Sequence, residues 1–115
     1  MRIMEHGQDR PWHKLVREDA LTVGQLRMAR IGVRQVVIAR TDNGIRIYRN
    51  RCPHAGAPLS GGRLDGEHII CPRHQWAFCV DDGQCPEHPI YALRAYNVEV
   101  RDGWVYAQEQ EEEIW

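Results

Sequence analysis

The sequence lacks any long apolar run: the longest, Val36 to Ala39, falls far short of the roughly 18 residues that a membrane-spanning helix needs. Residues 1–6 lack the apolar core of a secretory signal, so a cytoplasmic location is expected. The formal net charge is only −1, with 27% charged residues, which argues against a protein that binds nucleic acids or membranes through bulk charge. Four cysteines in 115 residues are also too few for a disulfide-dense secreted module.

Internal repeats and linkers rich in Pro, Gly or Ser are absent as well, and 115 residues is a common length for one domain. The charge is nevertheless uneven along the chain. Residues 27–51 carry seven Arg against one Asp, whereas residues 99–115 carry six acidic residues against one Arg. This asymmetry either steers a charged partner at long range or reflects solvated strand faces and a loose acidic tail.

Convincing helix signals are missing, and only residues 20–30 leave room for a helical turn. Short β-rich runs alternate instead with Gly-containing turns, and the turns at Asn43-Gly44 and Asp102-Gly103 each predict a β-hairpin. This pattern predicts an all-β fold, either a sandwich or a small barrel. The predicted strands are residues 35–41, 45–49, 67–71, 77–80, 96–101 and 104–108.

Two Cys/His pairs carry the chemistry: Cys52 with His54 and Cys71 with His74, with 16 residues between His54 and Cys71. Both pairs lie beside Pro and Gly at predicted strand ends, where loops can present metal ligands. They fit either a structural zinc ion or a [2Fe-2S] cluster with mixed ligands. The single residue between Cys52 and His54 favours two irons, because zinc sites usually leave about two to four residues between paired ligands. Two unrelated buried cysteines and two surface histidines are the alternative without a metal.

The stretches CPHAGAPLSGG (residues 52–62) and CPRHQWAF (residues 71–78) resemble the Rieske iron–sulfur family. The resemblance implies an antiparallel β fold with a cluster-binding subdomain at one tip, and one Rieske-type [2Fe-2S] cluster. It implies four cluster ligands, two sulfurs on one iron and two ring nitrogens on the other, from Cys52 and Cys71 and from His54 and His74.

The resemblance also divides the chain. Residues 12–108 are expected to form the Rieske domain, after an N-terminal segment at residues 1–11 and before an acidic C-terminal tail at residues 109–115. In this family a third, proline-containing loop usually covers the cluster, and residues 85–89 are the candidate for that cover.

The sequence departs from the family pattern at several positions near the implied ligands. High-potential members join their two loops by a disulfide, but the matching positions hold Ala57 and Arg73. Their Ser and Tyr hydroxyls near the cluster match Trp76 and Phe78, and fewer hydrogen bonds to the cluster sulfurs lower the potential. We therefore expect a potential near the low end of the Rieske range, about −150 mV. Gln75 replaces a usual Gly, so the second loop is expected to be strained or to follow another path.

Five further residues have weaker signals. Trp76 is expected to shield the cluster by packing rather than to act as an electron-relay or docking residue. His88 is expected on the surface, with a place near the cluster in the covering loop as the alternative. Cys79 is expected to be a small buried residue on a strand and Cys85 an incidental thiol, with a strained local disulfide between them as the alternative. Arg73 faces either a partner or solvent.

The resemblance implies a soluble one-electron carrier, a Rieske-type ferredoxin that passes electrons from a reductase to a terminal, aromatic-ring-hydroxylating oxygenase. The chain itself is not expected to be an enzyme, because the oxygenase needs a mononuclear iron site in a larger domain. The spare histidines form no 2-His-1-carboxylate arrangement; they are His6, His13, His68 and His88. The alternative is a Rieske-like small subunit of a multi-subunit oxidoreductase such as assimilatory nitrite reductase. A zinc-stabilised interaction module is the less favoured interpretation.

Overall fold

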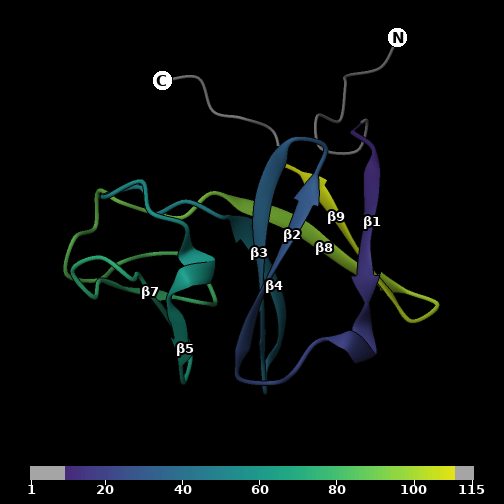
Figure 1. Cartoon of the computed structure of the whole chain (residues 1–115), viewed down its shortest axis with the longest axis horizontal. Coiled ribbons are helices and arrows are strands. Elements are labelled where there is room, and N and C mark those ends of the chain that lie inside the picture. Colours follow the sequence, from purple (N-terminus) through teal and green to yellow (C-terminus); the bar gives the residue numbers. More distant parts are fainter. Residues whose placement is uncertain (1–9, 111–115) are drawn as a thin grey trace, which may run out of the picture.

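The computed structural model describes residues 10–110, which form two antiparallel β-sheets (Figure 1). The larger sheet has the strand order β1-β9-β8-β4-β3-β2, and the smaller has the order β5-β6-β7. The predicted all-β fold class is confirmed. Two 3-10 turns, η2 (Glu18–Ala20) and η3 (Leu59–Gly61), connect strands, and no helix of the described residues is long and apolar enough to cross a membrane. The strands are β1 (Trp12–Arg17), β2 (Gln25–Ile31), β3 (Arg34–Thr41), β4 (Gly44–Arg49), β5 (Arg63–Asp65), β6 (His68–Ile70), β7 (Ala77–Cys79), β8 (Ala95–Arg101) and β9 (Trp104–Glu109).

The six-stranded sheet curls into a half-barrel, and its edge strands β1 and β2 come into contact. Both predicted hairpins, β3–β4 and β8–β9, are present. In the second hairpin the turn residues Asp102 and Gly103 have φ values of 54° and 81°, as a type I′ turn requires. In Figure 1 this turn lies on the far side of the larger sheet from β5 and β7. The predicted ends of the chain, residues 1–11 and 109–115, fall mostly outside the described residues, so the division into segments stays a prediction.

The prediction of a helical turn within residues 20–30 is wrong. The turn η2 ends at Ala20, and Gln25–Ile31 form the edge strand β2, which pairs along its whole length with β3. The apolar residues of β2 do not alternate strictly. Leu26 packs into one core of the molecule, whereas Ala29 and Ile31 pack into the other. A strand that contributes to two cores lacks the period-two pattern by which strands are recognised.

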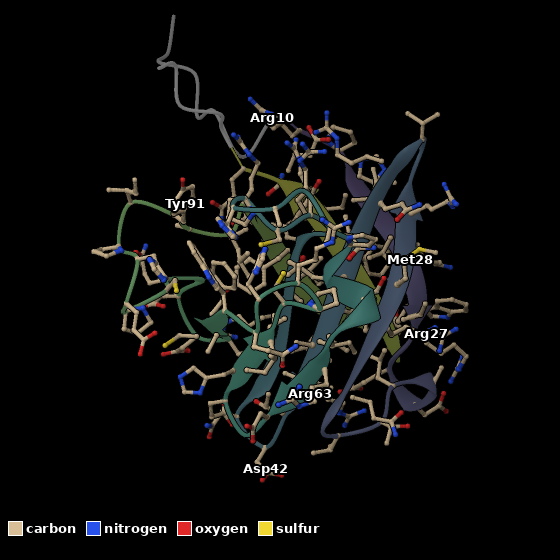
Figure 2. The ribbon with its side chains drawn as sticks, turned by 60° about the vertical axis from the view of Figure 1, so that its left-hand side comes forward. Arg10, Arg27, Met28, Asp42, Arg63 and Tyr91 are labelled. Carbon is tan, nitrogen blue, oxygen red and sulfur yellow. The ribbon has the colours of Figure 1, made fainter. Side chains whose placement is uncertain are left out.

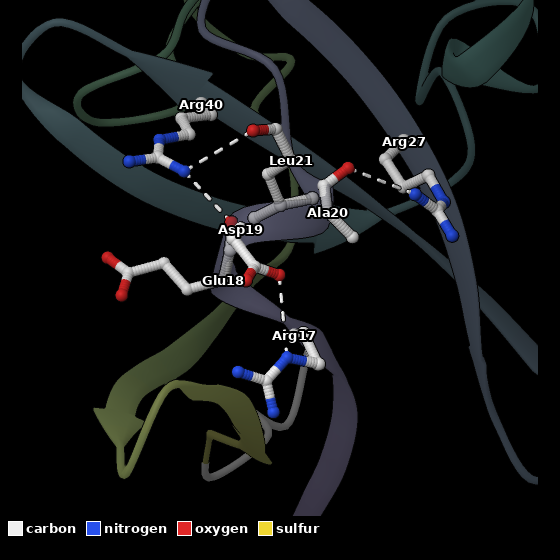
Figure 3. A network of polar contacts seen from close by, with 7 residues as sticks. All are labelled: Arg17, Glu18, Asp19, Ala20, Leu21, Arg27 and Arg40. Atoms are coloured by element: carbon white, nitrogen blue, oxygen red, sulfur yellow. Dashed lines mark hydrogen bonds and ion pairs between the residues drawn. The ribbon is translucent and has the colours of Figure 1, made fainter.

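Two arginine side chains hold the connection between β1 and β2 (Figure 3). Nη1 of Arg40 donates to the carbonyl oxygens of Glu18 (2.9 Å) and Leu21 (3.3 Å). Nη1 of Arg27 donates to the carbonyl oxygen of Ala20 (3.3 Å). Part of the arginine excess in residues 27–51 therefore satisfies backbone carbonyls at a turn rather than steering a partner.

Strand β3 is buried on both faces, which explains the apolar run at residues 36–39. Val36 and Ile38 pack inside the half-barrel with residues of β4, β8 and β9. Val37 and Ala39 belong to a second core, which lies beneath the three-stranded sheet and the loops attached to it. A strand covered on both faces needs no alternation of apolar and polar residues.

The hydroxyl of Tyr48 joins the two sheets. Tyr48 lies on β4, its side chain is buried in the second core, and its hydroxyl donates a hydrogen bond to the carbonyl oxygen of Val80, the residue after β7. Burial raises the pKa of Tyr48 to about 12, although the nearby Arg46 guanidinium opposes the rise. This bond holds the three-stranded sheet against the larger one.

Replacing Tyr48 by Phe keeps the ring and removes the donor from the buried carbonyl of Val80. We expect the free energy of unfolding to fall by about 1–3 kcal/mol, measured by urea denaturation. The folded pKa of Tyr48 lies above its ordinary value of 10.0. The difference in the free energy of unfolding between the wild type and Tyr48→Phe is therefore fully present below pH ~10. It shrinks as the pH rises toward the folded pKa. Tyr106→Phe on β9 is the control, and a Tyr48→Phe variant as stable as that control contradicts the role of the hydroxyl.

Gly62 allows the chain after η3 to approach β6 closely. A Cβ atom at Gly62 would lie 1.8 Å from the carbonyl oxygen of Ile70, whereas one at Gly61 would make an ordinary 3.7 Å contact with Cγ of Pro72. We expect Gly62→Ala to destabilise the protein by about 3 kcal/mol or more, because the backbone itself must shift. Gly61→Ala is the matched control. Thermal melts that place both variants at the same midpoint contradict this close approach.

Candidate metal centre

Two loops project from the second core and carry the predicted Cys/His pairs. The first Cys/His loop (residues 50–62) connects β4 to β5, and the second Cys/His loop (residues 71–76) connects β6 to β7. The same backbone hydrogen bond closes both loops. The N–H of Cys52 donates to the carbonyl of Ala57, and the N–H of Cys71 donates to that of Trp76, each at 2.8 Å. Each loop therefore presents its Cys and its His on one tight turn.

Asn50 fixes the base of the first Cys/His loop. Its side chain is buried, and its Nδ2 donates to Oε1 of Gln35 (3.1 Å) and to Oγ of Ser60 (2.9 Å). Its Oδ1 accepts the backbone N–H of Ser60 (2.8 Å). The buried amide thus joins the start of the loop, its end and strand β3, so the loop conformation depends on the sheet behind it.

The two thiols of the pairs lie together at the inner side of the loops. Cys52 and Cys71 are fully buried in the second core, and their side chains are within hydrogen-bonding reach of each other. The backbone N–H of Arg73 donates to Sγ of Cys71 (3.4 Å). Burial raises the pKa of the Cys71 thiol, and the adjacent Cys52 adds to the rise. A metal bound here must displace protons from this thiol pair, since the thiolate is the ligand.

The two imidazoles of the pairs lie at the outer side of the loops. The ring centroids of His54 and His74 are 5.3 Å apart, with the planes inclined at 66°. Nδ1 of His54 is buried and, within residues 10–110, has no hydrogen-bond partner. Buried polar atoms without a partner are uncommon, and an unpaired ring nitrogen on the same loop as one thiol of the pair suits a metal ligand.

Rings from the second Cys/His loop and from residues 85–92, here called the cover loop, enclose His54. Trp76 stacks on His54, with centroids 3.7 Å apart and planes 11° apart, and His88 stacks on the other face of Trp76 at 3.6 Å and 6°. Tyr91, labelled in Figure 2, meets His54 edge-on at 5.9 Å. Trp76 therefore packs as a shield, as predicted. The prediction that His88 lies on the surface is wrong, because the ring stack leaves it half-buried.

The cover loop includes residues 85–89, the predicted cover, from which His88 joins the ring stack, and a short run of turns shapes it. The N–H of His88 donates to the carbonyl of Cys85, and the N–H of Tyr91 donates to that of His88, each at 2.9 Å. Cys85 is buried in the second core rather than incidental, and Cys79 on β7 is only half-buried. Both thiols are free.

Gln75 adopts the backbone conformation that usually requires glycine. Its φ is 60°, and that of the preceding His74 is 65°. Two consecutive non-glycine residues in the left-handed region cost about 1–3 kcal/mol each. The loop is thus strained, as predicted, and Oε1 of Gln75 accepts a hydrogen bond from Nη1 of Arg63 at 3.1 Å.

The four candidate ligands are grouped as two pairs. Within residues 10–110, no three His, Cys, Asp or Glu side chains gather closely enough to hold a single metal ion. The four donors form a thiol pair and an imidazole pair, which fits a [2Fe-2S] cluster with one pair on each iron. The spare histidines stand elsewhere: His13 is on β1 and His68 on β6, while His6 lies outside the described residues.

Comparisons with known proteins identify the family of the chain. The family model of the Rieske [2Fe-2S] domain matches residues 11–97, which include both Cys/His loops and the cover loop. Ferredoxin CarAc of Metapseudomonas resinovorans is 33% identical over 97 residues, covering 83% of this chain and 91% of the relative. The ferredoxin component of the alkene monooxygenase system of Xanthobacter autotrophicus is 27% identical over 88 residues, covering 76% and 72%.

A solved structure is similar over nearly the whole fold. In a complex of reduced oxygenase and oxidized ferredoxin in carbazole 1,9a-dioxygenase, one chain superposes with a TM-score of 0.78 at 32% identity, over 89% of this chain and 97% of that one. Several other relatives are longer, and this chain matches between 13% and 27% of their length. The fold, the paired donors and the family match lead to one conclusion: the chain belongs to the Rieske [2Fe-2S] domain family.

Proposed function

We propose that this chain is a one-electron carrier that receives electrons from a reductase and delivers them to a terminal oxygenase. Sγ atoms of Cys52 and Cys71 hold one iron in this proposal, and ring nitrogens of His54 and His74 hold the other. The observation that carries it is the buried, unpaired Nδ1 of His54, two residues along the same tight turn from Cys52 of the thiol pair. The relatives that match most of their own length are ferredoxins, and one is a component of an oxygenase system.

The residues around the donors serve electron transfer rather than bond chemistry. When bound, the cluster takes up and releases one electron. Two neutral imidazoles in place of two thiolates make the site less negative by two charges, which raises its potential over that of an all-cysteine site. The thiols lie in the dry core, and His74 is exposed at the surface. This arrangement keeps water from the sulfurs and leaves one ligand within reach of a partner.

The same proposal includes the setting of the protein. It places the chain in the cytoplasm. Cys79 and Cys85, which are not proposed ligands, form no disulfide within the described residues, which is consistent with a reducing compartment.

Substitution of the proposed ligands tests the cluster assignment. We expect His54→Ala and His74→Ala to abolish the visible absorption of the oxidised protein and the electron-spin-resonance signal of the reduced one. His88→Ala is the matched control, because His88 belongs to the same ring stack but is not a proposed ligand. Iron and sulfide analysis accompanies the spectra. A native spectrum in His54→Ala shows that the ligand set is wrong, and a colourless wild-type protein that holds zinc contradicts the function.

The potential is expected near the low end of the Rieske range, about −150 mV, by redox titration of the wild-type protein. The residues that replace the hydroxyl-bearing ones are Trp76, which stacks on His54, and Phe78, which is fully buried. Neither side chain can donate a hydroxyl hydrogen bond to a cluster sulfur. Phe78→Tyr, which restores such a hydroxyl, is expected to raise the potential. A wild-type midpoint well above zero contradicts this account.

A further inference from the structure

The two proposed imidazole ligands differ in exposure. His54 is covered by Trp76 on one face and met edge-on by Tyr91, with His88 beyond the tryptophan. His74 is exposed. Electron transfer between proteins slows steeply as the intervening distance grows, so a partner gains most by docking over the uncovered ligand. The face of His74 is therefore the natural contact surface.

Three arginine side chains lie on or beside the two Cys/His loops. Arg73 precedes His74 in the second Cys/His loop and is exposed. Arg63, labelled in Figure 2, reaches across from β5 to the side chain of Gln75, the residue after His74. The guanidinium of Arg51 lies over the first Cys/His loop, where a Cβ atom at Gly56 would be 3.4 Å from its Nη2.

Acidic residues are rare in the same region. Residues 50–62 and 71–76 contain no Asp or Glu, and the cover loop at residues 85–92 contains Glu87 alone. The two loops, the cover loop and strand β5 therefore carry three guanidinium groups (Arg51, Arg63 and Arg73) against two carboxylates (Asp65 and Glu87), although the whole chain has a net charge of −1. The sign of the local charge is opposite to the sign of the total.

We propose that this arginine border, Arg51, Arg63 and Arg73 around His74, is the docking surface for a redox protein with an acidic face. The inference rests on the proposed function and adds the sign and place of the charges that select the partner. Complementary charge increases the rate of encounter and fixes orientation more than it increases affinity. It does so here directly over the exposed ligand.

Small redox complexes of opposite charge test the sign of the charge at the docking surface. The reduced holoprotein is mixed in a stopped-flow instrument with hexacyanoferrate(III), a trianion, or with tris(phenanthroline)cobalt(III), a trication. Ionic strength is raised from about 0.01 to 0.15 M, which shortens the Debye length from about 30 to about 8 Å. We expect the rate with the anion to fall about tenfold and the rate with the cation to rise. A response governed by the net charge of −1 has the opposite sign and overturns the proposal.

Charge variants test where on the molecule the docking surface lies. Arg63→Gln combined with Arg73→Gln is expected to reduce the rate with the anion about threefold at low ionic strength. Arg101→Gln combined with Arg17→Gln removes the same charge near the β8–β9 turn, across the larger sheet from β5 and β7, and is expected to leave the rate unchanged. The variants are compared by the slope of the reaction rate against ionic strength, because this slope does not depend on the driving force for electron transfer. Equal slopes for the two double variants overturn the proposal.

A second pair of variants separates the two imidazole faces. Gln75→Glu adds a negative charge beside exposed His74, and Ile90→Glu adds one on the cover loop beside Tyr91, where Ile90 is 86% exposed. We expect Gln75→Glu to reduce the rate with the anion more than Ile90→Glu does. The reverse order contradicts docking at the face of His74. The absorption spectrum and midpoint of each variant are recorded first. A wild-type protein without a reducible cluster refutes the proposed function itself, whereas a normal cluster with salt-independent rates refutes only the arginine border.

Discussion

The burial of β3 on both faces is the constraint on which the rest of the structure depends. One face of this strand completes the half-barrel, and the other forms the floor of the second core. The Cys/His loops have no support of their own beyond that core, since the three-stranded sheet beneath them consists of strands of three residues each. Asn50, which follows β4, extends this support into the first Cys/His loop by its hydrogen bond with Ser60, and Tyr48 of β4 extends it to Val80 after β7. The candidate metal centre is thus held by the sheet rather than by the loops alone.

Much of the fold follows from short-range signals in the sequence. The hairpins could be predicted because an Asn-Gly or Asp-Gly turn between β-rich runs is a local feature. Strands β1 and β2 could not be predicted in this way, because no such turn joins them to their pairing partners β9 and β3. In addition, the edge strands of a curled sheet divide their side chains between different surroundings. Leu26 and Ala29 illustrate this: three residues apart, they serve separate cores.

The candidate ligands could also be predicted from a local signal, because each Cys/His pair lies within one turn and the flanking prolines and glycines mark the turns. The positive φ of Gln75 was foreseeable from the family position alone. The ring stack was not, because it brings together His54, Trp76 and His88 from three loops, and no spacing in the chain records that contact. The arginine border could not be predicted for the same reason. The charge count along residues 27–51 includes Arg27 and Arg40, which bind backbone carbonyls, and omits Arg63 and Arg73.

The division into two cores has a consequence for how the molecule opens. The half-barrel and the second core share strands but not side chains, so exchange of amide hydrogens can proceed in one while the other stays closed. The Tyr48 hydroxyl ties strand β4, which both units share, to Val80 of the loop-bearing unit. Local unfolding of the loop-bearing unit would expose the donor atoms without dissolving the half-barrel. A polypeptide built this way can acquire its inorganic group after most of the chain has already folded.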